Sequence, residues 1–125
     1  MCHDHDSRPP APPRAAVDVA ERGELTLTAA DGNRFSAAYA APAGPARAGV
    51  VLLPDIRGLH PYYVALAERF AEAGVPAVAL DYFGRTAGLA ETGTREDDFD
   101  WQSHIPQTTP EGLSLIHISE PTRPY

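Results

Sequence analysis

At residues 48–60 the sequence reads AGVVLLPDIRGLH, and at residues 75–88 it reads VPAVALDYFGRTAG. Each run is apolar for several residues and then turns polar, which is typical of a strand that is buried on both faces and ends at the rim of a sheet. We expect residues 48–54 to form a strand in the middle of a sheet. Residues 75–80 are expected to form a second buried strand.

The segment between these two runs has the pattern of a helix. Pro61 suits the first helical turn, and Gly74 is placed to cap the C-terminus. The apolar residues between them fall on one helical face: Tyr63, Leu66, Ala67, Phe70 and Ala71. Strand, helix and strand at this spacing predict a right-handed βαβ unit with a parallel sheet.

A hairpin is predicted before this unit. Residues 24–29 and 34–39 both alternate between apolar and polar side chains, and Asp31-Gly32 lies between them. This dipeptide accepts the positive φ angles of a type I′ turn. Residues 1–22 are polar and rich in proline, so we expect a flexible tail there. The domain proper is predicted over residues 23–112.

The region after the second strand is expected to be irregular. Residues 84–108 contain several glycines and an acidic stretch, which indicate a long surface excursion. Thr109, Pro110 and Glu111 then have the pattern of a helix N-terminus.

Composition excludes several classes of function. The chain has 125 residues, a formal net charge of −7 and only 10 basic residues, so no nucleic-acid partner is expected. Its apolar runs are far shorter than the ~20 residues that span a bilayer, so no membrane partner is expected either. Cys2 is the single cysteine and cannot form an internal disulfide. We expect a soluble cytoplasmic protein of unknown oligomeric state.

The carboxyl ends of neighbouring parallel strands meet at one rim, where open α/β sheets bind ligands. The two runs quoted above, followed by PQTTPEG at residues 106–112, resemble the dienelactone hydrolase family of the α/β-hydrolase superfamily. The resemblance covers residues 24–112. It implies an α/β fold of which this chain holds the N-terminal part, a β-hairpin followed by a βαβ unit. It also implies hydrolysis of a small ester or lactone by a Cys-His-Asp triad through an acyl-enzyme, without a cofactor.

Three residues take candidate roles from this resemblance. Asp55 stands where the family has a glutamate that interacts with the nucleophile, but its side chain is one methylene shorter. The backbone N–H of Ile56 falls where the family places half of its oxyanion hole. Arg85 falls on an arginine that binds a substrate carboxylate. Alternatively, Asp55 pairs with Arg57 or caps the following helix, and Arg85 is a solvated loop cation.

No triad member is predicted among these residues. A nucleophile elbow needs Gly-x-Cys-x-Gly or Gly-x-Ser-x-Gly, which the sequence does not contain, and the acid and histidine follow the nucleophile in this fold. We therefore expect the chain to be truncated before the elbow and to be inactive on p-nitrophenyl acetate. A serine esterase or thioesterase on the same fold stays open as an alternative for the whole protein.

The two ends of the sequence carry further expectations. Residues 113–123, LSLIHISEPTR, resemble a one-frame translation of a transposon-end sequencing adapter, so residues 113–125 are expected to be foreign to the natural protein. At the other end, Cys2, His3 and His5 offer metal ligands, and a non-catalytic metal-binding module is the alternative from another class. We predict no metal site.

Four other polar or aromatic residues have no role that the resemblance transfers. His60 is expected to be an N-cap or a surface residue, and Asp81 is as consistent with a structural role as with a catalytic one. Trp101 and His104 lie in the excursion, where a lid or cleft wall is conceivable.

Overall fold

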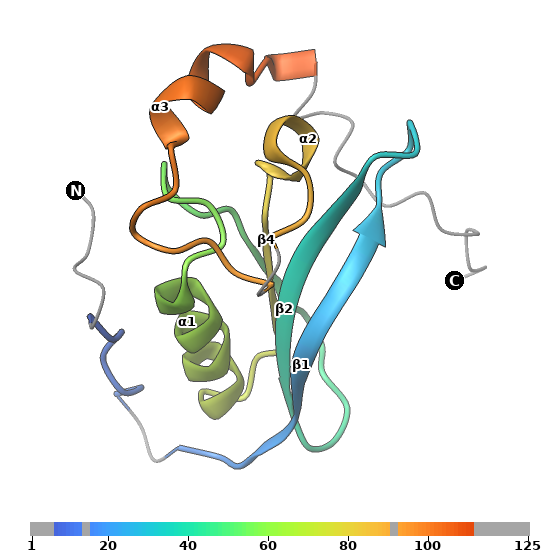
Figure 1. Ribbon diagram of the computed structural model, residues 1–125. Coiled ribbons are helices and arrows are strands. Elements are labelled where there is room, and N and C mark those ends of the chain that lie inside the picture. The colour runs from blue at the N-terminus through green and yellow to red at the C-terminus, as the bar shows by residue number, and fades with distance from the viewer. Residues whose placement is uncertain (1–6, 14–15, 91–92, 112–125) are drawn as a thin grey trace.

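The computed structural model describes residues 7–13, 16–90 and 93–111. A four-stranded mixed sheet has the order β1-β2-β4-β3, and one long helix covers it (Figure 1). The strands are β1 (Val19–Thr28), β2 (Arg34–Pro42), β3 (Val50–Leu52) and β4 (Ala77–Leu80). The helices are α1 (Pro61–Glu72), α2 (Gly84–Ala87) and α3 (Trp101–His104), which a 3-10 turn over Ile105–Gln107 follows.

The hairpin and the βαβ unit are both confirmed. β1 and β2 pair antiparallel. β3 and β4, which precede and follow α1 in the sequence, pair parallel. The two units join because β2 pairs antiparallel with β4. The predicted α/β class therefore holds, and the sheet that results is mixed because β1, β2 and β4 pair antiparallel.

The hairpin turn differs from the predicted type I′. The Gly32 N–H donates to the Ala29 carbonyl at 2.9 Å, and the Ala29 N–H donates to the Asn33 carbonyl at 2.8 Å. Gly32 has a φ of 90°, whereas no non-glycine residue in the described ranges has a positive φ. Only one left-handed residue is present, so the connection is a three-residue loop ending in a left-handed glycine.

The strand at residues 48–54 was expected in the middle of the sheet, and that prediction is wrong. β3 is three residues long and forms an edge, pairing with β4 alone among the described residues. Val51 is 62% exposed and Leu53 is 66% exposed. An apolar run indicates that a strand is suited to a buried position. It does not tell which segment of the protein covers the strand.

α1 is held at both ends by local contacts. The side chain of His60 caps the N-terminus, where its Nδ1 accepts from the Tyr62 N–H at 3.1 Å. At the C-terminus, Gly74 donates to the Ala71 carbonyl and Val75 donates to the Phe70 carbonyl, which is a Schellman motif. The predicted capping role of Gly74 is thereby confirmed, and so is His60 as an N-cap.

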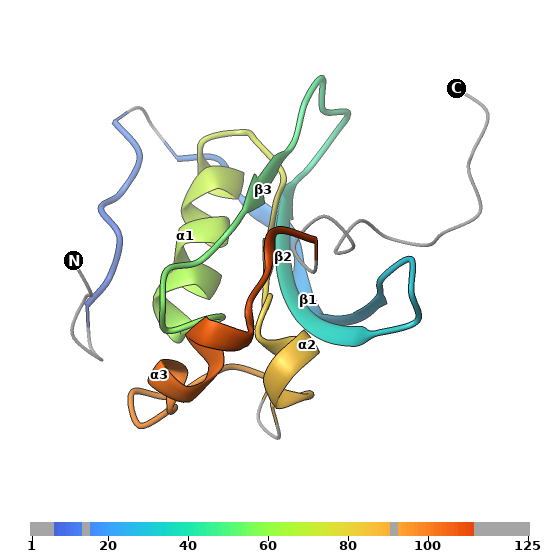
Figure 2. The same cartoon turned by 90° about the horizontal axis from the view of Figure 1, so that it is seen from above.

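Small side chains bring α1 close to the sheet. The helix lies along the sheet (Figure 2), and Ala67 and Ala71 pack against Ala40 of β2 and Ala77 of β4. The opposite face of the sheet has a second core formed by Ala29, Phe35, Ala37 and Leu80. β2 and β4 therefore present alanines to the helix, while Phe35 and Leu80 lie on the other face, since side chains alternate between faces along a strand.

The ends of the chain are described only in part. β1 begins at Val19, inside the segment predicted as a tail, and Pro9 is buried. The possible metal ligands Cys2, His3 and His5 lie outside the described residues, as does the segment 113–125. Pro110 and Glu111 are helical, and the rest of the helix predicted there also lies outside. No helix within the described ranges is long and apolar enough to cross a membrane.

Candidate active site

The loop that leaves β3 forms a tight turn over residues 55–58. The Asp55 carbonyl accepts from the Gly58 N–H at 3.0 Å, and Gly58 has a φ of 70°. A Cβ at Gly58 would lie 2.9 Å from the Phe83 ring and 3.0 Å from Asp81 Oδ1. Glycine is needed here both for the left-handed backbone and for the close approach of the segment that follows β4.

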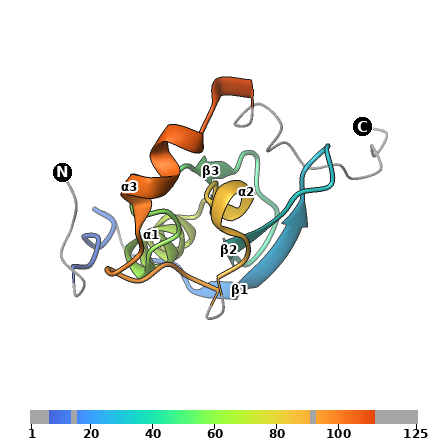
Figure 3. The ribbon, with the colours of Figure 1, turned by 45° about the horizontal axis from the view of Figure 1, so that its top comes forward.

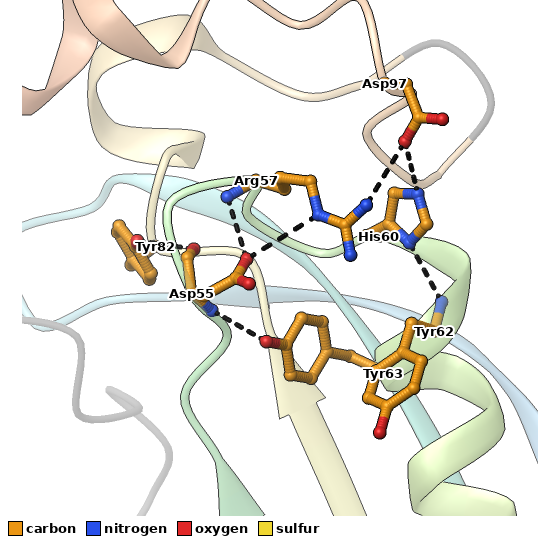
Figure 4. Close-up of polar contacts among 7 residues, drawn as sticks. All are labelled: Asp55, Arg57, His60, Tyr62, Tyr63, Tyr82 and Asp97. Carbon is orange, nitrogen blue, oxygen red and sulfur yellow. Dashed lines mark hydrogen bonds and ion pairs between the residues drawn. The ribbon is translucent and has the colours of Figure 1, made fainter. Parts of the chain in front are cut away.

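Asp55 directs its carboxylate into its own turn. Its Oδ1 accepts from the Arg57 N–H at 3.0 Å and lies 3.9 Å from Arg57 Nε (Figure 4). Its Oδ2 is buried without a hydrogen-bond partner in the described part of the chain. The contact with Arg57 is the one anticipated as the structural alternative, and the free Oδ2 leaves one oxygen for a further partner.

The backbone N–H of Ile56 occupies the first central position of the same turn. Within the described ranges, no hydrogen bond involves this N–H. It belongs to a half-buried residue at the carboxyl end of β3. An N–H in this position is available to an oxygen atom that comes from outside the turn.

Two tyrosines hold the backbone of Asp55. The sequence pattern placed Tyr63 only on the apolar face of a helix and gave Tyr82 no role. The hydroxyl of Tyr82 donates to the Asp55 carbonyl at 2.7 Å, and the Asp55 N–H donates to the hydroxyl of Tyr63 at 3.2 Å. Tyr82 follows β4 and Tyr63 lies in α1, so both phenols approach from outside the turn (Figure 4). The convergence of two strand ends at one rim was the only sequence signal for Tyr82.

Arg57, His60 and Asp97 form a second polar group at the rim. Asp97 Oδ1 lies 2.8 Å from His60 Nε2 and 3.3 Å from Arg57 Nη1. Because Nδ1 of His60 accepts from Tyr62, the ring proton of the neutral form is on Nε2 and points to Asp97. His60 has no exposed surface, so of the two expected alternatives the N-cap holds and the surface location does not. These contacts attach the excursion to the turn after β3.

Asp81 and Arg95 form a buried ion pair beneath the excursion. Arg95 Nη2 lies 2.8 Å from Asp81 Oδ2, and both side chains are almost fully buried. Burial raises the pKa of the Asp81 carboxyl, and the charge of Arg95 opposes that rise. The Arg95 N–H also donates to the Leu59 carbonyl at 2.8 Å. Asp81 therefore has a structural partner and anchors the excursion.

Arg85 lies in α2 and contacts the hairpin loop. Its two terminal nitrogens bind the two carboxylate oxygens of Asp31, one of them at 3.2 Å. The hydrogen bond from Arg85 lowers the pKa of the Asp31 carboxyl. No contact in the described residues joins Arg85 to Asp55 or to the Ile56 N–H. The structure thus brings Asp55 and Ile56 together and gives Arg85 a carboxylate partner of its own.

α3 lies over the strand ends beside α2 (Figure 3). The His104 ring stacks on Phe99 with a centroid distance of 5.4 Å, and Phe99 lies 5.1 Å from Phe83. Phe83 is fully buried under this group. His104 therefore belongs to an aromatic cluster that covers the rim, while Trp101 is half-buried at the start of α3. In the described residues no group of three or more potential metal ligands is present.

No protein-family model and no curated protein matches the sequence. Solved structures do match the fold. A dienelactone hydrolase-like promiscuous phosphotriesterase from metagenomic libraries superimposes with a TM-score of 0.51 and 24% identity, covering 69% of this chain and 34% of that one. A Klebsiella pneumoniae subsp. pneumoniae MGH 78578 protein assigned as a dienelactone hydrolase gives a TM-score of 0.47 and 20% identity, covering 77% and 35%. A hypothetical protein from Pseudomonas aeruginosa gives 0.40 and 19%, covering 65% and 25%.

The match with the metagenomic hydrolase shows the fold. The described residues have the hairpin and βαβ arrangement of the N-terminal part of dienelactone hydrolase-like α/β-hydrolase structures, as the sequence predicts. The chain spans about a third of the length of the first two matched structures.

Proposed function

We propose that this chain is the N-terminal part of a hydrolase that cleaves a small anionic ester or lactone through an acyl-enzyme. In this reaction a nucleophile attacks the carbonyl carbon, the carbonyl oxygen becomes an oxyanion, and the alcohol leaves with a proton. Water then releases the acid. The nucleophile, its histidine and its acid come from the rest of the whole protein in this proposal, and no cofactor takes part.

One observation carries the proposal: the Ile56 N–H, in the turn that follows β3, has no hydrogen-bond partner among the described residues. Developing charge on a carbonyl oxygen is stabilised by backbone donors that are fixed before the reaction begins. The turn over residues 55–58 fixes this N–H because the same peptide unit has its carbonyl held by the Gly58 N–H. Ile56 is thus the proposed oxyanion donor.

Asp55 and Arg85 take the supporting roles. Asp55 places a carboxylate next to the donor, its buried Oδ2 has no hydrogen-bond partner among the described residues, and we assign it the adjustment of the nucleophile. Arg85 is assigned to the anionic group of the substrate. Its hydrogen bonds to both carboxylate oxygens of Asp31 support this role, because a planar guanidinium group can bind any carboxylate in the same bidentate way. A substrate carboxylate has to displace Asp31.

The test removes the backbone N–H of residue 56. In the full-length protein, Ile56→Pro eliminates the N–H, and proline is favoured at the first central position of a turn. The loss of one oxyanion donor is expected to lower kcat on p-nitrophenyl acetate by about 10²–10³-fold. Ile56→Val, which keeps the N–H, is the matched control and should retain activity.

Circular dichroism of both variants establishes that the fold is kept. A folded Ile56→Pro protein that hydrolyses the ester as fast as Ile56→Val would overturn the assignment of Ile56 and with it the proposed function.

A further inference from the structure

We propose that Tyr82 is a positioning residue that orients and polarises the peptide unit carrying the Ile56 N–H. This inference rests on the proposed function, since it concerns the donor that the function needs. It assigns to Tyr82 a role through the backbone of Asp55 and no contact with substrate.

The contact is made to the same peptide bond. The N–H of Ile56 and the carbonyl of Asp55 belong to one planar unit and point in opposite directions. Tyr82 donates to that carbonyl at 2.7 Å and Gly58 donates to it at 3.0 Å. A carbonyl oxygen has two lone pairs, so both acceptor positions are used. With the carbonyl fixed from two sides, the direction of the N–H is fixed as well.

The preceding peptide unit is held from the opposite side. The Asp55 N–H donates to the Tyr63 hydroxyl at 3.2 Å, and the Tyr63 ring packs edge-on against Tyr62 at 5.4 Å. The Tyr82 ring packs against Phe83 at 4.4 Å. Two phenols anchored in different elements, α1 and the end of β4, therefore meet at one residue of the turn (Figure 4).

This arrangement also strengthens the donor. A hydrogen bond accepted by a carbonyl polarises the amide and makes its N–H a better donor, by ~10–30% per bond. Burial, together with the negative charges of Asp55 and Asp81, raises the pKa of Tyr82 to about 12. The hydroxyl therefore keeps the proton that it donates throughout the neutral and mildly alkaline range.

The first experiment is NMR of the 125-residue chain with Tyr82→Phe, which deletes only the hydroxyl. Loss of the hydrogen bond should move the Asp55 carbonyl carbon and the Ile56 amide proton upfield. Tyr39→Phe, in β2, is the matched control and should leave both signals in place. Incorporation of 3-fluorotyrosine into the unmutated chain makes the phenols stronger donors and should move the Asp55 carbonyl signal downfield. If Tyr82→Phe does not fold, this second measurement tests the inference, and an unmoved signal would overturn it.

The second experiment measures kinetics in the full-length protein. Tyr82→Phe is expected to lower kcat by about five- to tenfold and to leave KM nearly unchanged, as loss of one supporting hydrogen bond implies. Signals that stay in place in Tyr82→Phe, or an unchanged kcat where Ile56→Pro removes activity, would overturn the inference and leave the proposed function intact. If Ile56→Pro is instead fully active, the proposed function fails, and the NMR shifts alone decide whether Tyr82 orders this peptide.

Discussion

Two regions differ from the usual distribution of side chains: the rim formed by the segments after β3 and β4 buries charged residues, and the edge strand β3 exposes apolar ones. At the rim, the side chains of Arg57 and Arg95 are each only 8% exposed. A few residues earlier, Val51 of β3 is 62% exposed, and Leu53, directly after β3, is 66% exposed. Charged groups are normally exposed, and large apolar groups are normally buried.

The two inversions have different physical meanings. A buried arginine is tolerated only when its charge is paired, and Arg57 and Arg95 each lie against an aspartate. Both buried charges at the rim are therefore compensated by groups of the described residues. An exposed apolar edge strand has unused hydrogen-bonding groups and apolar area that another strand would bury. The buried arginines of the rim thus have partners within the described residues, whereas the edge presents apolar area that a further strand would cover.

The largest expected effect comes from the buried pair at the rim. Arg95→Met leaves the Asp81 carboxylate buried without its partner, which should lower the free energy of unfolding by about 3–5 kcal/mol. Urea denaturation at pH 7 measures this change in the free energy of unfolding. Arg47→Met, which removes an exposed arginine, is the control and should have almost no effect.

The pH dependence of the same variant sharpens the result. Burial already raises the pKa of Asp81, and removal of Arg95 raises it further. A carboxyl whose pKa is higher in the folded state binds its proton more tightly there, so the stability of Arg95→Met should rise as the pH falls toward that pKa. If Arg95→Met lowers the free energy of unfolding by less than Arg47→Met does at any pH, the Asp81–Arg95 pair does not stabilise the rim.

A smaller effect is expected at His60, which has two roles. His60→Ala removes the cap of α1 and the contact with Asp97, and should cost about 1–2 kcal/mol. His60→Asn restores a good N-cap but not the contact with Asp97. Its stability should therefore return most of the way to that of the unmutated chain, while hydrogen exchange at residues 95–97 stays fast. Slow exchange at these residues in both variants would mean that His60 does not tether the excursion.

Most of the backbone was predictable because local patterns determine it. The alternation on both sides of Asp31-Gly32 specified the hairpin, and Pro61 with Gly74 specified the ends of α1. The turn type was missed because the sequence does not reveal that Asp31 keeps a negative φ and that the left-handed conformation falls on Gly32 alone. β3 was misplaced because strand order depends on long-range pairing.

In the candidate site, only the proximity of residues that are neighbours in the sequence was predictable. Asp55 and Ile56 lie together because they are neighbours in sequence. Tyr82 meets Asp55 across 27 residues and Asp97 meets His60 across 37, and no local pattern encodes either contact. The pairing of Arg85 with Asp31, 54 residues apart, was likewise beyond sequence reasoning. Side-chain partners at a rim follow from tertiary packing, so residue type and position give candidates and not contacts.

The smallest effect on stability, and the most direct test of the edge, is expected from Val51→Lys. This side chain is already exposed, so the free energy of unfolding should change by no more than about 0.5–1 kcal/mol. A lysine on an edge strand opposes strand addition, so self-association of the 125-residue chain should fall in sedimentation velocity at rising concentration. Val17→Lys is the control, since Val17 is 47% exposed and lies before β1. Each substitution takes the formal charge from −7 to −6, which weakens repulsion between chains equally. A reduction confined to Val51→Lys therefore assigns association to the β3 edge, and an equal reduction in both variants would contradict that assignment.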